Sequence, residues 1–157
     1  MPFLCPECST PRSLKIKAKI ELPPDSRSDE ITLQVVECSR CRFAGIAVYE
    51  ESRRGALDSE SFSHVGYRVS AKDLRTLKRT IKQCPNPNNW RCECSSHRTL
   101  GGKDVGGRWN GLKEIHCTGE FKLNLYEFRW QGLEGFQSAA SVRSFARGTF
   151  PISTWPR

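Results

Sequence analysis

Apolar and charged side chains alternate through the first third of the chain. In residues 14–22 every second position is apolar and the positions between are Lys or Glu, the period of a strand with one buried face and one solvated face. The prolines of residues 23–29 interrupt this pattern, and Ile31, Leu33 and Val35 resume it. The alternation predicts an antiparallel sheet of three strands, over residues 14–22, about 30–37 and 43–49.

A helical period follows between residues 70 and 83. Leu74, Leu77 and Ile81 recur on one stripe at helical spacing, and basic side chains occupy the opposite side. Ser70 is a suitable N-cap, and the prolines at 85 and 87 prevent the helix from continuing. The segment before this helix, residues 51–66, is polar with little pattern and is expected to form a linker. A further alternation predicts a strand over residues 119–129.

Two pairs of cysteines flank the predicted hairpin. Cys5 and Cys8 form one CxxC pair, and Cys38 and Cys41 form another. A two-residue spacer lets both sulfurs of a pair turn towards one ion, and a hairpin brings its two ends together. Because spacing and strand pattern agree, we expect these four cysteines to bind one zinc ion.

Residues 3–50 resemble a zinc ribbon, in which two cysteine knuckles hold a hairpin and a third strand. The first knuckle, Cys5-Pro6-Glu7-Cys8, is of a form frequent in that group. The resemblance covers about a third of the chain, and it implies a fold and a metal. It does not imply a function, because a fold can carry many functions.

A second cluster of metal-binding side chains lies between residues 84 and 117. The four thiols are the first choice as ligands of a second zinc ion, with His97 as the best substitute. One of the central cysteines as a core thiol, and His116 as a hydrogen-bond donor only, are alternatives. The candidates are Cys84, Cys92, Cys94, His97, His116 and Cys117.

Composition bears on the compartment and on the use of the cysteines. Hydrophobic residues make up 37% of the 157 residues and charged residues 27%, which excludes a membrane-embedded chain and a largely disordered one. No apolar run approaches the roughly 18–20 residues of a membrane span. The first residues lack the features of a secretion signal, so we expect an intracellular protein, cytoplasmic or nuclear. Thiols stay reduced there, which favours zinc over disulfides for the eight cysteines.

Charge is distributed unevenly along the chain. The formal net charge is +8, yet residues 1–59 carry nine charges of each sign. Residues 68–83 have six basic residues against one acid, and residues 129–157 have four against one. Such clusters favour contact with a phosphate backbone, although a solvated helix face is the plainer alternative. The candidate phosphate-binding residues are Lys72, Arg75, Lys78, Arg79 and Lys82.

Four tryptophans lie next to arginines in the second half of the chain. A Trp–Arg pair can stack on a base while the guanidinium meets a phosphate. We expect Trp90 and Trp109 to pack instead in a small core beside the second zinc ion, as most aromatic side chains pack. Trp155, near the end of the chain, is expected to be the exposed one.

Together these patterns predict a small α+β protein stabilised by two zinc ions. The expected domains are a three-stranded antiparallel zinc ribbon over residues 1–50, a linker over 51–66, a basic helix with a loop-rich second zinc module and a strand over 67–130, and a basic tail over 131–157.

The function favoured by the sequence is binding of DNA or RNA, alone or within a nucleic-acid-processing complex. An adaptor that binds protein partners through its zinc modules is the alternative. A zinc-dependent hydrolase or nuclease is less favoured, because no HExxH, deaminase or nucleophile-elbow pattern is present.

Overall fold

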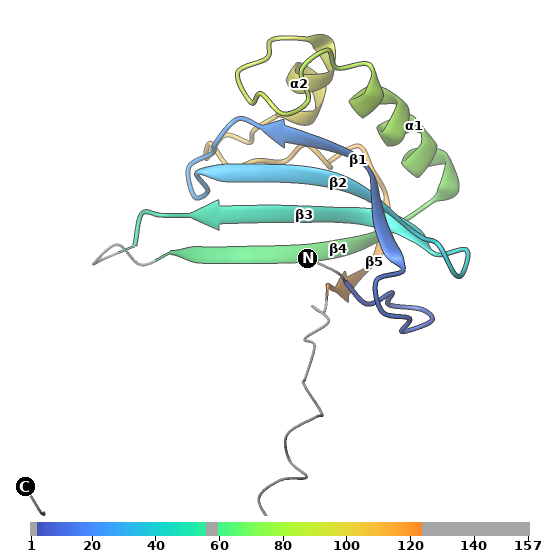
Figure 1. Cartoon of the computed structure of the whole chain (residues 1–157). Helices are drawn as coiled ribbons and strands as arrows, with labels where there is room; N and C mark the ends of the chain where they lie inside the picture. Colours follow the sequence, from blue (N-terminus) through green and yellow to red (C-terminus); the bar gives the residue numbers. More distant parts are fainter. Residues whose placement is uncertain (1–2, 56–59, 124–157) are drawn as a thin grey trace, which may run out of the picture. The chain divides into compact units, whose positions relative to one another are not determined.

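The computed structural model describes residues 3–55 and 60–123. These residues form a five-stranded antiparallel sheet in the order β1-β2-β3-β4-β5 and two short helices (Figure 1). The elements are β1 (Leu14–Leu22), β2 (Glu30–Cys38), β3 (Ala44–Ser52), β4 (Ser61–Val69), α1 (Ala71–Lys82), α2 (Ser95–Leu100) and β5 (Cys117–Lys122). No helix among the described residues has the length and apolar character required to cross a membrane.

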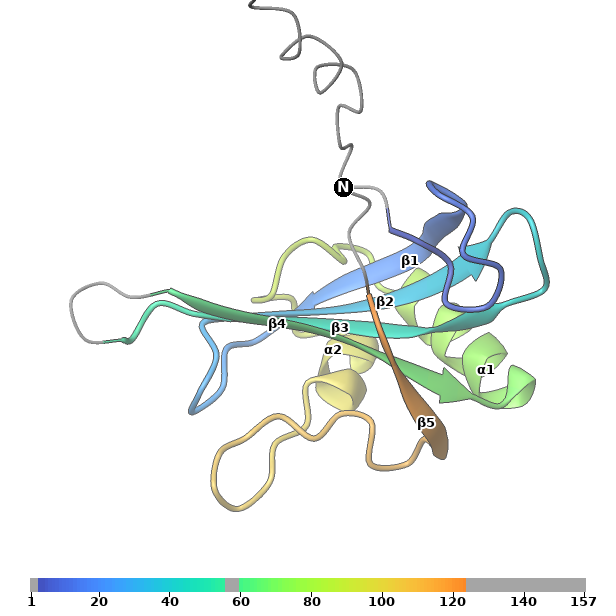
Figure 2. The ribbon, with the colours of Figure 1, turned by 90° about the horizontal axis from the view of Figure 1, so that it is seen from below.

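The predicted fold class, a separate three-stranded zinc ribbon followed by a basic helix and a loop-rich second module, is wrong. The first three strands lie where the alternation predicted them, but they continue into a larger sheet. β4 pairs with β3 from Ile46↔Tyr67 to Ser52↔Ser61, and β5 pairs with β4 in turn. Figure 2 shows how the long loop after α2 returns the chain to place β5 beside β4.

The sequence did not predict β4 as part of the sheet because residues 51–66 were expected to form a linker. Residues 51–66 contain the end of β3 and the first part of β4. On β4, Phe62, His64 and Gly66 lie on the same face of the sheet. One of them is large and apolar, one is polar and one has no side chain, so this face has no consistent hydrophobic pattern. The alternation is therefore hidden in the sequence. The expected tail, residues 131–157, and the last part of the strand expected over 119–129 lie outside the described residues.

One face of the sheet is covered by the two helices (Figure 1). α1 begins after Ser70, whose hydroxyl accepts a hydrogen bond from the Asp73 N–H at 3.1 Å, as the sequence predicted. Its apolar stripe, Leu74, Leu77 and Ile81, is buried against the sheet. The main core lies here, and its strand residues are Ile20, Leu22, Ile31, Leu33, Val35, Ile46 and Val48.

A smaller core lies on the opposite face, next to the first cysteine group. Phe43 and Phe121 meet edge to face in it, with ring centroids 5.1 Å apart. Gly66 is the partner of Phe121 across the β4–β5 ladder. A Cβ atom at this glycine would overlap the Phe121 ring, which is itself buried and in contact with Phe43. The absence of a side chain at Gly66 therefore allows β5 to dock its aromatic ring on the sheet.

A buried carboxylate joins the β1–β2 turn to the loop that precedes β5. One oxygen of Asp25 accepts hydrogen bonds from the Arg27 and Ser28 N–H groups at 2.7 and 2.6 Å, and the other accepts from the Trp109 N–H at 2.7 Å. Burial raises the pKa of Asp25, but these backbone donors, together with the charge of Lys103, lower it overall.

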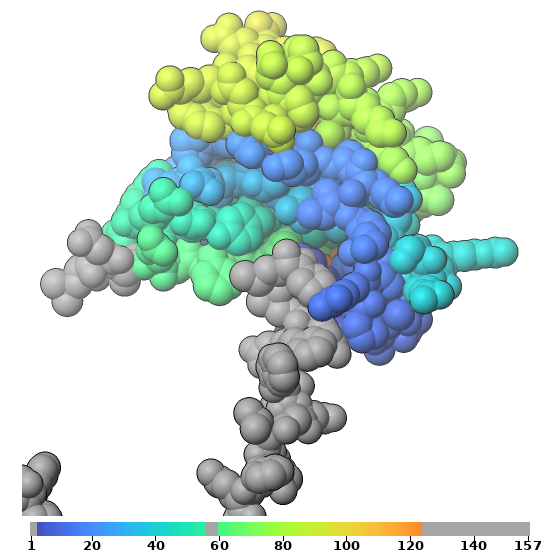
Figure 3. Space-filling model, viewed as in Figure 1, coloured from blue at the N-terminus to red at the C-terminus, as the bar shows by residue number. Residues whose placement is uncertain are grey.

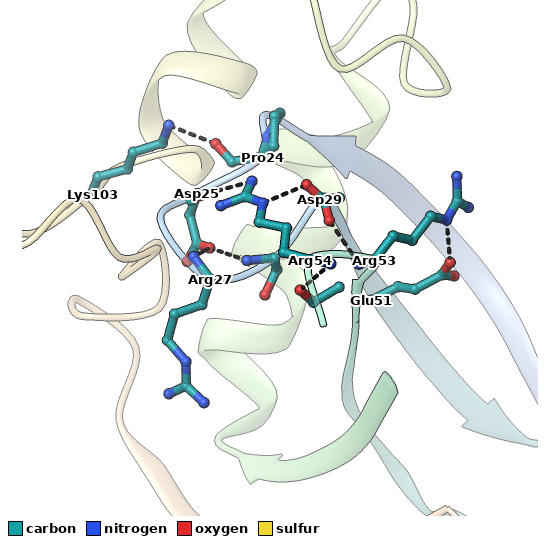
Figure 4. Close-up of polar contacts among 10 residues, drawn as sticks. Pro24, Asp25, Arg27, Asp29, Glu51, Arg53, Arg54 and Lys103 are labelled. Atoms are coloured by element: carbon teal, nitrogen blue, oxygen red, sulfur yellow. Dashed lines mark hydrogen bonds and ion pairs between the residues drawn. The ribbon is translucent and has the colours of Figure 1, made fainter. Parts of the chain in front are cut away.

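Ion pairs surround this turn (Figure 4). The Lys103 ammonium donates to the Pro24 carbonyl at 2.7 Å, and Arg54 pairs with Asp29 at 2.7 Å. These contacts are largely exposed, so they contribute less to stability than the buried carboxylate does.

We expect Gly66→Ala to destabilise the protein by about 1–3 kcal/mol, because the added methyl group cannot be accommodated against the buried Phe121 ring. Gly119→Ala is the matched control. It lies in the neighbouring strand, and its Cβ atom would find its nearest neighbour, Arg68 Cδ, at 3.8 Å. Chemical denaturation of the zinc-loaded protein measures the free energy of unfolding of both variants. Equal stability of the two variants would contradict this account of the β4–β5 packing.

Asp25→Ala is expected to lower the free energy of unfolding by about 2–3 kcal/mol, because it leaves buried backbone donors without an acceptor. Asp29→Ala removes a carboxylate from the same turn whose partners are exposed, and we expect a much smaller loss. Denaturation curves at neutral pH compare the two variants. If Asp29→Ala lowers the free energy of unfolding as much as Asp25→Ala does, burial of the carboxylate does not determine the size of the effect.

Candidate metal centres

The first cysteine group is assembled from two turns. Cys5 and Cys8 precede β1, Cys38 ends β2, and Cys41 lies in the turn to β3. The four sulfurs lie within 4.8 Å of one another, with Cys5 and Cys41 3.6 Å apart and Cys8 and Cys38 3.7 Å apart. Four sulfurs about 2.3 Å from one zinc ion would be about 3.8 Å apart. The group is therefore consistent with a tetrahedral zinc ion.

The sheet itself brings the two turns together. Leu14 pairs with Cys38 where β1 meets β2, and the Ser39 N–H donates to the Ser13 carbonyl at 2.8 Å. The N–H groups of Arg40 and Cys41 point at the Cys38 sulfur, at 3.3 and 3.4 Å. Such N–H···S contacts stabilise a thiolate and orient it towards a metal.

The pKa values of these thiols indicate a need for a cation. Burial raises the pKa of Cys38, but the Ser13 hydroxyl and the Arg40 and Cys41 N–H groups lower it to about 6. At Cys41 the Phe43 N–H lowers the pKa, whereas burial and the neighbouring thiols raise it to about 12. Contacts with Thr10 also lower the pKa of Cys8, whereas burial raises that of Cys5. Two of the four thiols therefore ionise readily, and the other two resist ionisation beside them. A divalent cation removes this conflict, because all four can then be thiolates.

The second group combines three thiols and one imidazole, those of Cys84, Cys92, Cys94 and His97. Cys84 follows the end of α1, and Cys94 is the N-cap of α2. The Nδ1 atom of His97 lies 3.3 Å from the Cys84 sulfur and 3.4 Å from that of Cys94, and the Cys84 and Cys92 sulfurs are 3.9 Å apart. These separations also match a tetrahedral zinc ion, with bonds of about 2.3 Å to sulfur and 2.0–2.1 Å to nitrogen.

His97 is fixed in the orientation that zinc ligation requires. Its ring is buried, and the Nε2 atom lies 2.9 Å from the Glu21 carbonyl of β1. A carbonyl oxygen can only accept, so Nε2 carries the proton and Nδ1 offers its lone pair to the thiols. The Glu21 N–H donates to the Pro87 carbonyl at 2.7 Å, so both backbone groups of this residue hold the second centre.

The thiols of the second group differ in pKa as those of the first do. The His97 N–H and ring lower the pKa of Cys94 to about 6, against the effect of burial. Burial, and to a smaller extent the neighbouring thiols of Cys94 and Cys92, raise the pKa of Cys84 to about 11. A bound cation would again allow every thiol to ionise.

The sequence analysis preferred Cys117 as a ligand of this centre, but the structure does not place it in the group. Cys117 begins β5, opposite Val69, and its thiol is exposed and outside both groups. His97, the expected substitute, occupies the place, and His116 belongs to neither group. The spacing Cys94-x-x-His97 contains the relevant signal. A Cys at the N-cap and a His three residues later come together within one helical turn.

The structure separates the predicted phosphate-binding residues into two kinds. Lys72, Arg75, Arg79 and Lys82 are exposed on α1, and none of them makes an ion pair within the part of the chain that the structure describes. Lys78 is half-buried instead, and its ammonium pairs with Glu37 of β2 at 2.6 Å. Four of the five cations therefore remain available to a ligand.

The tryptophans also divide. Trp109 packs against the main core as expected, and its Nε1–H donates to the Leu100 carbonyl at 2.7 Å. Trp90 does not follow the expectation of a packed side chain, because it is 41% exposed and stacks on its neighbour Arg91. Trp155 lies outside the described residues.

Comparisons with protein-family models, with curated proteins and with solved structures found no match to this chain. The resemblance to a zinc ribbon therefore has no support beyond the cysteine groups themselves. The donor sets and their geometry carry the assignment of two zinc ions.

The purified protein is expected to hold two equivalents of zinc by elemental analysis after dialysis against a moderate chelator. Cys94→Ser should lower the content to one, because it removes a ligand of the second centre only. Cys117→Ser is the control and should keep both ions. Loss of zinc from the Cys117 variant, or less than one equivalent in the parent protein, would refute these ligand sets.

Proposed function

We propose that this chain is a zinc-stabilised nucleic-acid-binding protein that contacts the phosphate backbone through α1. The observation that carries the proposal is the exposed basic face of α1, on which Lys72, Arg75, Arg79 and Lys82 make no ion pair with the described residues. Acids one turn away from these cations would pair with them and stabilise the helix. The only acid within α1 is Asp73, whose carboxylate is engaged by the Ser70 hydroxyl at 2.8 Å.

The basic surface extends from α1 onto the neighbouring edge of the sheet. β1 contacts α1, and both lie side by side on the face seen in Figure 3. Lys15, Lys17 and Lys19 are exposed along β1. Residues 14–22 and 71–98 together carry ten basic and three acidic side chains, so they account for +7 of the formal net charge of +8. These two segments therefore carry most of the positive charge that would attract a polyanion.

Zinc in this proposal is structural. Each group offers four protein ligands, which is the complete set of a structural zinc ion. When bound, each ion holds thiolates together that would otherwise repel one another. A centre of four thiolates carries about −2 and one of three thiolates and a neutral imidazole about −1, which leaves a net charge of about +5. The basic surface thus outweighs the charge of its own metal centres.

The edge of the sheet is less suited to the alternative function, docking of a protein strand. Exposed lysines along an edge strand oppose pairing with another strand. At the end of β1 the outward backbone groups of Glu21 are already engaged by His97 and Pro87. These features favour nucleic acid over strand addition at β1. The basic tail, which was also expected to contact phosphate, lies outside the described residues.

Replacing Arg75 and Arg79 together with Gln tests the proposal. Each lost duplex phosphate contact should lower affinity and reduce the slope of log K against log salt by about one unit. Thermal stability should change little, since Arg and Gln have similar helix propensity and both side chains are exposed. Titration of fluorescent duplex and single-stranded oligonucleotides at several salt concentrations gives affinity and slope together.

Arg27→Gln combined with Lys113→Gln is the matched control. It removes the same charge at exposed positions outside the basic surface, one in the β1–β2 turn and the other in the loop before β5. This control should retain most of the affinity and nearly the full salt slope. If the two double variants behave alike, or if the parent protein binds no nucleic acid, α1 is only a solvated helix and the proposal fails.

A further inference from the structure

Trp90 is the one exposed tryptophan among the described residues. It is 41% accessible, and the Arg91 guanidinium carbon lies 4.7 Å from its ring centroid. A large aromatic side chain at the surface lacks the stabilisation that burial would give it. The Arg91 guanidinium thus lies over one face of the ring, and both side chains are exposed to solvent.

The second metal centre fixes this pair at the end of the basic helix. Trp90 lies two residues before the ligand Cys92, whose sulfur is 3.9 Å from that of Cys84. Cys84 itself follows the last residue of α1, Lys82, by two positions. The zinc ion therefore joins the C-terminal end of α1 to the Trp90–Arg91 pair. The basic face of α1 and the aromatic side chain are therefore joined through the same metal centre.

The loop that carries Trp90 is held by its own hydrogen bonds. The Asn89 N–H donates to the Asn86 carbonyl at 3.1 Å, and the Cys92 N–H donates to the Asn89 carbonyl at 3.0 Å. The Asn89 side chain accepts from the Arg91 N–H at 3.0 Å, and Pro87 accepts from β1. A ligand would therefore meet a preformed loop and lose little entropy in ordering it.

Trp90 lines a shallow, open groove of about 740 Å³. Trp90, Arg91 and Arg98 supply its aromatic and cationic lining, and Glu93 is the acid among its lining residues. The metal ligands Cys92 and His97 also line it. The groove thus offers a ring for stacking and guanidinium groups for phosphate, and these belong to the same basic surface as α1.

We infer that this groove binds single-stranded nucleic acid, with a base stacked at the Trp90–Arg91 pair and the adjoining phosphates on α1. The inference rests on the proposed function and specifies its ligand. Stacking on an aromatic side chain requires a base with a free face, which a single strand offers and an intact duplex does not. DNA and RNA share this chemistry, because both combine phosphodiesters with unstacked bases.

The test uses the full zinc-loaded chain with Trp90→Ala and Trp90→Phe. Single-stranded DNA, single-stranded RNA and a duplex of the same sequence are the three ligands. Loss of one stacked base should weaken single-strand binding by about 5- to 100-fold. Phe should restore most of that affinity, and duplex binding should change less than about twofold because it relies on phosphate contacts. The two single-stranded arms identify the preferred backbone.

Tryptophan fluorescence gives a second readout that does not depend on the Ala variant folding. Saturating single strand should quench part of the emission of the parent protein, and this part should be absent in Trp90→Phe at equal occupancy. If Arg75→Gln with Arg79→Gln weakens binding but the Trp90 variants alter neither single-strand affinity nor quenching, the inference is overturned and the proposed function stands. If no nucleic acid binds the parent protein, both fail.

Discussion

The contact between His97 and the Glu21 carbonyl joins the second metal centre to the edge of the sheet. At the other end of the same strand, Leu14 pairs with Cys38 of the first centre. β1 therefore extends between two cross-links, and neither end of this edge strand depends on strand pairing alone. In a chain of 157 residues with two modest cores, such cross-links replace stabilisation that a larger core would supply.

The two centres anchor opposite faces of the sheet. Cys84 belongs to the main core beneath α1, whereas Cys5 belongs to the smaller core with Phe43 and Phe121. Each face thus combines apolar packing with a group of thiols that can all be thiolates together once a cation is bound. The long loop between α2 and β5 contributes no ligand to either centre and is held instead by the contacts of Trp109 with Asp25 and with the Leu100 carbonyl.

Local patterns in the sequence identified the first centre and α1, because their spacing is set within a hairpin or a helix. The paired CxxC motifs, the strands of residues 14–22 and the stripe of Leu74, Leu77 and Ile81 are of this kind. The features that could not be predicted from the sequence depend on contacts between residues that are far apart along the chain. β4 carries a glycine at position 66 because the space beside it is filled by Phe121 from β5, and residues 51–66 were therefore expected to form a linker. Likewise His97 replaces Cys117 because the position of β5 removes that thiol from the centre.

The ligands of each centre are close together along the chain, and this has a consequence for the order of folding. Cys5 and Cys41 are 36 positions apart, and Cys84 and His97 are 13 apart. Short loops close at low entropic cost and close quickly. A growing chain has all four donors of the first group before β4 has been synthesised. We expect the β1–β2 hairpin to acquire its metal during synthesis and to serve as the template on which the remaining strands assemble.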